Sequence, residues 1–111
     1  MWQTVRVRGR GRATVAAYGM ADAEAQVEKE LGRLWPGADV QVEEITRHGP
    51  PRIVEEFEVA YTVTGVVEVE VEHEPDAPGA AFRQLRNRFE SSRFSHTSWE
   101  EIDPGRRLAG W

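Results

Sequence analysis

Four arginines at alternate positions near the start of the sequence could bind a charged ligand together. They are Arg6, Arg8, Arg10 and Arg12. Alternate residues of a strand share one face, so the four guanidinium groups could follow the phosphates of a single-stranded nucleic acid. Domains that bind such strands also stack the bases on aromatic rings, and no aromatic residue lies between the first and the last of these arginines. We therefore favour ion pairs within a sheet as their role and keep nucleic-acid binding as the alternative.

A second basic group lies in the last third of the sequence. It consists of Arg83, Arg86, Arg88 and Arg93. The simple interpretation is a solvated helix face, because exposed charges contribute little to stability. The functional interpretation is a surface that docks on an acidic protein partner. Trp111 is a further candidate contact, because tryptophan is enriched at interface hot spots. These five residues form the predicted partner-binding set.

The residue types that catalysis and metal binding need are few and badly spaced. The histidines are His48, His73 and His96, and the sequence contains no cysteine. None of the histidines has the spacing of metal ligands. The sequence also has no G-x-S-x-G elbow, phosphate-binding loop or dinucleotide fingerprint. We therefore predict no catalytic residue, no metal site and no cofactor, and hence a non-enzymatic role.

Length and charge narrow the class of protein further. The 111 residues fit one domain, and the net charge of -5 disfavours bulk attraction to nucleic acid or to an anionic membrane. No apolar run approaches the roughly 20 residues needed to cross a bilayer, and the first residues lack the apolar stretch of a signal peptide. We expect a cytoplasmic protein without a membrane partner.

Two long strands are the strongest structural signal. Residues 5–17 alternate valine, glycine or alanine with the arginine row, and residues 57–71 alternate apolar residues mainly with threonine and glutamate. Apolar residues at helical spacing then predict two helices. The remaining elements are expected as a helix over 22–35, a strand over 39–46, a helix from 76 to the serines at 91–92, and a strand over 94–102.

The second half of the sequence repeats the first at a constant shift. This shift aligns Gly11 with Gly65 and Asp22 with Asp76. Residues 42–45 and 99–102 both end in Glu-Glu-Ile, after three extra residues in the second copy. Duplication and a chance likeness between two amphipathic units both explain this pattern, and the architecture is the same in either case.

Two strand–helix–strand units predict an α+β domain of the ferredoxin-like type. Its order is β-α-β-β-α-β, with a four-stranded antiparallel sheet and both helices on one face. The expected boundaries are 1–105 for the single domain, 1–47 and 53–103 for its halves, and 106–111 for a C-terminal tail. Right-handed crossovers place the two long strands side by side in the centre. Glu68, Glu70 and Glu72 are then expected opposite the arginine row, as its ion-pair partners.

These features favour a small, acidic, non-enzymatic protein-binding module that docks on a protein partner. Accessory subunits and inhibitors of the phage or host-defence type have this profile. Self-association through the sheet, as a homodimer, stays open. A single-stranded nucleic-acid-binding domain using residues 6–12 is the alternative. A small-molecule-binding or enzymatic ferredoxin-like domain is the second alternative.

Overall fold

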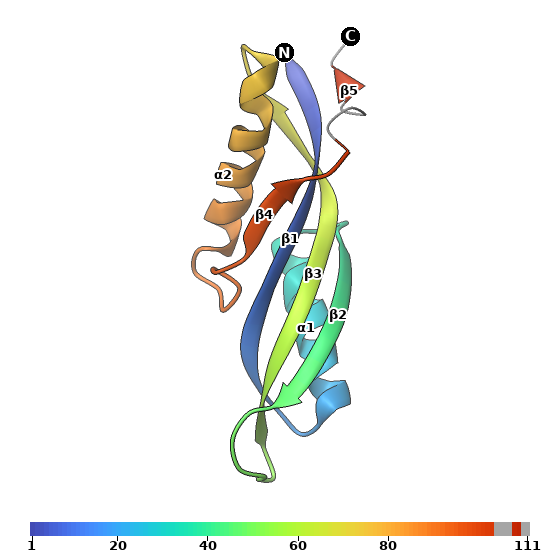
Figure 1. The fold of residues 1–111 in the computed structure, drawn as a ribbon, viewed down its shortest axis with the longest axis vertical. Coiled ribbons are helices and arrows are strands. Elements are labelled where there is room, and N and C mark those ends of the chain that lie inside the picture. Colours follow the sequence, from blue (N-terminus) through green and yellow to red (C-terminus); the bar gives the residue numbers. More distant parts are fainter. Residues whose placement is uncertain (104–107, 110–111) are drawn as a thin grey trace.

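Two strands of sixteen residues run side by side along the molecule and organise the fold (Figure 1). The computed structural model describes residues 1–103 and 108–109. Strand β1 (Trp2–Ala17) pairs antiparallel with strand β3 (Glu55–Glu70) over its full length. Odd-numbered residues of both strands are mostly valine, alanine, glycine or aromatic, and they face the core.

The other elements flank this central pair. They are helix α1 (Met20–Leu34), strand β2 (Asp39–Arg47), the 3₁₀ turn η1 (Glu74–Asp76), helix α2 (Ala77–Phe89), and strands β4 (Ser98–Glu101) and β5 (Leu108–Ala109). The sheet has the order β2-β3-β1-β4, β5 also pairs with β1, and all neighbours are antiparallel. Within the described residues the molecule is therefore an α+β fold with an antiparallel sheet and two helices.

The last strand is shorter than predicted. Only Ser98–Glu101 pairs as a strand, and the preceding residues form tight turns in which the N–H of Thr97 donates to the carbonyl of Phe94 at 3.2 Å. The side chains of Phe94 and Thr97 are both buried. Two buried residues three positions apart suit a turn, because a strand would place them on opposite faces.

Both helices pack their apolar stripes into one core. The stripe of α1 and its C-terminal cap is Ala23, Val27, Leu31 and Trp35, and the stripe of α2 is Ala77, Ala81, Leu85 and Phe89. The shift that aligns Gly11 with Gly65 also aligns each residue of the first stripe with its counterpart in the second. The same shift relates Gly9 to Val63, and these two residues are paired at the centre of the sheet. The two halves of the chain therefore use equivalent positions for the core.

The two helices start near opposite ends of the central strand pair (Figure 1). Trp99 of β4 contacts Trp35, the C-cap residue of α1, and Phe89, the last residue of α2. Its ring lies edge-on to Trp35, with 5.9 Å between the ring centroids, and edge-on to Phe89 at 4.9 Å. A Cβ atom at Gly9 would lie 2.5 Å from the ring of Trp99. The centre of the core therefore needs a strand position without a side chain.

A buried hydrogen-bond chain ties the turn before β4 to β3. The hydroxyl of Thr97 donates to the carbonyl of Phe94 at 2.6 Å, so the Tyr61 hydroxyl is the donor in its own 2.6 Å bond to Thr97 Oγ1. Burial raises the pKa of the Tyr61 hydroxyl, and the bond to Thr97 opposes this shift. The phenol is therefore a protonated, structural donor.

Gln3 buries an amide on the core face of β1. It is 1% exposed, and neither Nε2 nor Oε1 has a hydrogen-bond partner among the described residues. Gln3→Met keeps the length of the side chain and removes the unpaired polar atoms, so we expect the free energy of unfolding to rise by about 1–2 kcal/mol. Urea unfolding measures the change. Gln3→Glu is the control and should lower stability, because it would bury a charge; a loss of stability in Gln3→Met as well would contradict this account.

Candidate functional site

The arginine row lies on the open face of the sheet, opposite neutral residues of β3. The residues opposite Arg6, Arg8, Arg10 and Arg12 are Val66, Thr64, Thr62 and Ala60. The prediction that Glu68, Glu70 and Glu72 face this row is wrong, because Glu68 is opposite Thr4 and Glu70 is opposite Trp2. Glu72 lies beyond the end of the strand. The register of the two strands places Glu68 and Glu70 beyond the N-terminal end of the arginine row.

The row is instead paired with Glu58 at the other end of β3, with Glu100 of β4 and with Asp103 after β4. Its ion pairs join Arg6 to Asp103 at 2.6 Å, Arg8 to Glu100 at 3.3 Å, Arg12 to Glu58 at 3.4 Å and Arg10 to Glu100 at 4.0 Å. The side chains of Arg10 and Arg12 stay 64% and 60% exposed. They line an open hollow of about 480 Å³ together with Ser98 and Glu43. A phosphate group in this hollow would therefore meet a carboxylate as well as the two guanidinium groups.

The predicted partner-binding arginines lie on two different segments. Arg83, Arg86 and Arg88 are exposed on α2, and the last two lie in its final turn, where positive charge interacts favourably with the helix dipole. Arg93 lies in the segment after α2 and bonds to other parts of the fold. Trp111 lies outside the described residues. A role for these residues in partner binding stays a prediction.

Two stretches of the sheet have a free edge. Strand β4 pairs with β1 only from Val7 to Arg10, and β2 pairs with β3 only as far as Thr64. Among the described residues, no strand therefore lies beside residues 11–17 of β1 or residues 65–70 of β3 on these sides. A free edge presents backbone N–H and C=O groups that can recruit another strand, and proteins usually protect it.

Even-numbered residues direct their backbone groups to these free edges. The carbonyl of Arg6 accepts from the N–H of Ile102 on the β4 side, and the carbonyl of Glu56 accepts from the N–H of His48 on the β2 side. Backbone groups of successive residues in an antiparallel sheet point to opposite neighbours. The residues with backbone groups on the free edges are thus Arg12, Thr14 and Ala16 in β1, and Val66, Glu68 and Glu70 in β3.

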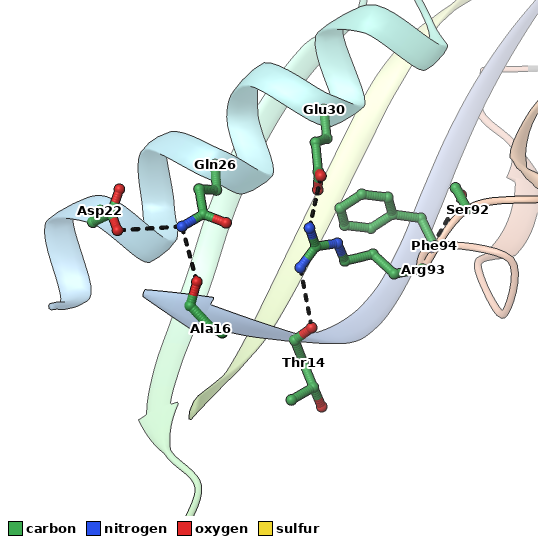
Figure 2. Close-up of polar contacts among 8 residues, drawn as sticks. All are labelled: Thr14, Ala16, Asp22, Gln26, Glu30, Ser92, Arg93 and Phe94. Carbon is green, nitrogen blue, oxygen red and sulfur yellow. Dashed lines mark hydrogen bonds and ion pairs between the residues drawn. The ribbon is translucent and has the colours of Figure 1, made fainter. Parts of the chain in front are cut away.

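Side chains from α1 and from the segment after α2 cap the free edge of β1 (Figure 2). Gln26 Nε2 donates to the carbonyl of Ala16 at 3.0 Å, and one guanidinium nitrogen of Arg93 donates to the carbonyl of Thr14 at 3.4 Å. Another nitrogen of Arg93 donates to Glu30 at 2.7 Å, which holds the guanidinium group in place. We call this stretch of β1 the capped edge. An incoming strand would have to displace both side chains.

The equivalent edge of β3 has no such cap. In the alignment of the two halves, the counterparts of Thr14, Ala16 and Gln26 are Glu68, Glu70 and Ala80. The methyl group of an alanine cannot donate a hydrogen bond. Arg93 has no counterpart at all, because it belongs to a connection that is three residues longer in the second half. No described side chain donates to the carbonyls of the two glutamates. We call the backbone of Val66, Glu68 and Glu70 the open edge.

A groove of about 340 Å³ lies beside the open edge, between β3 and α2. Its lining includes Trp2, Trp35, Val66, Leu85 and Arg88. Trp2 is 59% exposed and Val66 is 54% exposed. Large apolar side chains in water beside unpaired backbone groups are typical of a surface that meets another protein.

Sequence reasoning missed the open edge. It assigned Glu68 and Glu70 to the arginine row and gave no role to the exposed Val66. A signal was present in the internal repeat, because the second half has Ala80 where the first half has Gln26. That difference becomes meaningful only once both edges are known to be free.

Among the described residues, no group of three or more histidines, aspartates or glutamates could hold a metal ion. The helices of residues 1–103 are too short or too polar to cross a membrane. The sequence matches no protein-family model, no curated protein and no solved structure.

Proposed function

We propose that this chain is a small, acidic, non-enzymatic protein-binding module that takes an extended segment of a partner protein onto its open edge. One observation carries the proposal: of two equivalent edges, one is capped by side-chain donors and the other is uncapped beside the exposed Trp2 and Val66. Addition of a strand to a free edge gives affinity through main-chain hydrogen bonds, and side-chain pockets give specificity.

The proposal includes a ferredoxin-like topology built from the halves 1–47 and 53–103. Its support is the strand order, the antiparallel pairing and the constant spacing between the two helix stripes. In such a duplicated arrangement each half leaves one stretch of its long strand without a neighbour. Docking on one stretch and capping of the other then require only local differences between the halves.

Binding of single-stranded nucleic acid by the arginine row is the second candidate function. The exposed side chains of Arg10 and Arg12 support it. However, every arginine of the row has an acidic partner within 4.0 Å, and Glu43 lines the same hollow. Because phosphate binding depends on uncompensated positive charge, we rank protein docking above it.

A small-molecule-binding or enzymatic role has less support. A hollow of about 550 Å³ between α1 and the segment after α2 is lined by Glu30, Arg33, Leu34, Arg93 and Phe94 among others. A ligand site needs convergent polar groups that are available to the ligand. The guanidinium group of Arg93 is already bonded to Glu30 and to the carbonyl of Thr14.

Glu68→Pro tests the docking proposal. Proline removes the N–H of residue 68, which points to the open edge and not to β1, and edge strands tolerate proline in this orientation. A phage library that displays random peptides of about nine residues supplies the ligands. We expect peptides selected on the unchanged protein to lose affinity for Glu68→Pro by about tenfold or more in a fluorescence titration.

Two controls accompany this experiment. Glu68→Gln keeps the backbone N–H and should bind better than Glu68→Pro. Thr14→Pro makes the same change at the equivalent position of the capped edge, and it should leave binding unchanged. Circular dichroism checks that all variants are folded. Equal affinity of the unchanged protein and Glu68→Pro, or an equal loss in Thr14→Pro, would refute docking at the open edge.

A further inference from the structure

Resting on this proposed function, we infer that the open edge selects an extended segment with lysine or arginine at alternate positions and apolar residues between them. The inference concerns the chemistry of the partner. It follows from the side chains on the two sides of the open edge, which an incoming strand would have to match.

The solvent side of the open edge is acidic, and its two carboxylates form no ion pair with a described residue. Glu68 and Glu70 are exposed and have Thr4 and Trp2 as their neighbours on β1. Residues directly opposite each other on neighbouring strands place their side chains on the same face. The two residues of a partner strand that face these glutamates would therefore gain from a positive charge.

The core side of the open edge is apolar. Val67 and Val69 alternate with the two glutamates and are 5% and 4% exposed. The adjoining groove is lined by the apolar Trp35 and Leu85 and, along α2, by Gln84 and Arg88. Residues of a partner strand opposite the two valines would point toward this groove, so apolar side chains are favoured there. Together the two sides specify a strand in which basic and apolar residues alternate.

A second copy of this chain fits the open edge poorly. Antiparallel pairing of the whole open edge with itself would set Glu68 against Glu68 of the other copy, and a shift by one pair toward Glu70 would set Glu68 against Glu70. Like charges directly opposite each other destabilise a strand pair. The charge of the edge therefore favours a basic partner segment over a homodimer through this edge.

Two fluorescein-labelled peptides of about nine residues test the inference. One alternates lysine with valine, and the other alternates glutamate with valine. We expect the unchanged protein to bind the lysine peptide about tenfold more tightly, since two cross-strand charge pairs separate the peptides. The variant Glu68→Lys/Glu70→Lys should reverse this preference in a fluorescence anisotropy titration.

Glu24→Lys/Glu28→Lys is the matched control, because it makes the same change of net charge on the exposed face of α1. It should keep the preference for the lysine peptide. If Glu68→Lys/Glu70→Lys also keeps that preference, or if the α1 control loses it, the inference that the open edge selects basic segments is wrong. A loss of peptide affinity in Glu68→Pro would still support docking in that case. If neither peptide binds and no selected peptide is sensitive to Glu68→Pro, both proposals fail.

Discussion

Replacing Gly9 with valine is expected to remove about 3 kcal/mol or more of the free energy of unfolding, a large part of the total for a domain of this size. The first new atom would lie 2.5 Å from the ring of Trp99 and 2.7 Å from the methyl group of Thr97. The ring cannot retreat easily, because it is held edge-on against Trp35 and Phe89. Urea unfolding should show a large fall in the midpoint.

Gly32→Ala is the control for this experiment. Gly32 lies within α1, is exposed, and has open space where a Cβ atom would be added. Alanine has the higher helix propensity, so we expect a gain of about 0.5–1 kcal/mol. A midpoint of Gly9→Val equal to that of the unchanged protein would show that the centre of the core is packed differently.

Removing both caps is expected to turn the protein into a self-associating one. In the variant Gln26→Ala/Arg93→Ala, the carbonyls of Ala16 and Thr14 lose their side-chain donors. The uncapped stretch then matches the open edge of another copy. Antiparallel pairing would set Arg12, Thr14 and Ala16 of one copy opposite Glu70, Glu68 and Val66 of the next. Such a contact joins two different edges, so it continues from copy to copy into a filament or a ring.

Light scattering at increasing protein concentration measures this change. We expect a constant monomer mass for the unchanged protein and a rising average mass for Gln26→Ala/Arg93→Ala. Arg33→Ala is the control for the loss of a charge and should stay monomeric. Arg33 is exposed and lines the same hollow as Arg93, between α1 and the segment after α2. Adding Glu68→Pro to the double variant should restore the monomer. A double variant that stays monomeric at every concentration would show that the caps do not protect the edge.

The sequence predicts the two long strands and both helices because their periodicity is local and strong. Residues 5–17 and 57–71 each place apolar side chains on one face over more than ten residues, and this face is buried in the structure. The strand expected over 94–102 fails where Phe94 and Thr97 form a turn. Buried residues are three positions apart in this turn and two or four positions apart in a strand. This difference of one position is too small to distinguish a turn from a strand in a short segment.

The pairing register could not be predicted from periodicity. Any shift of β1 against β3 by two residues leaves every side chain on the same face, so the apolar pattern is equally satisfied. The charges favoured the register that faces arginine with glutamate, yet the structure sets Arg6 opposite Val66. Salt bridges at the surface contribute too little to decide a register that core packing already determines.

The side chains that cap the edge of β1 could not be predicted from the sequence for a different reason. Gln26 reaches Ala16 over ten positions, but Arg93 reaches Thr14 over 79. The second contact exists only after both halves have packed together. No local pattern distinguishes Arg93 from the exposed arginines of α2, because its role is set by the carbonyl it meets.

The register of the central pair also has a consequence for the rate of folding. Even the paired ends that are closest in sequence, Ala17 and Glu55, are separated by all of α1, β2 and the connection that follows. The β2–β3 hairpin closes over a much shorter loop. Because the entropy of closing a long loop is lost before its contacts form, we expect the joining of β1 to be the slow step. Until it joins, residues 65–70 of β3 have no strand on either side, so aggregation during synthesis is most favoured in that interval.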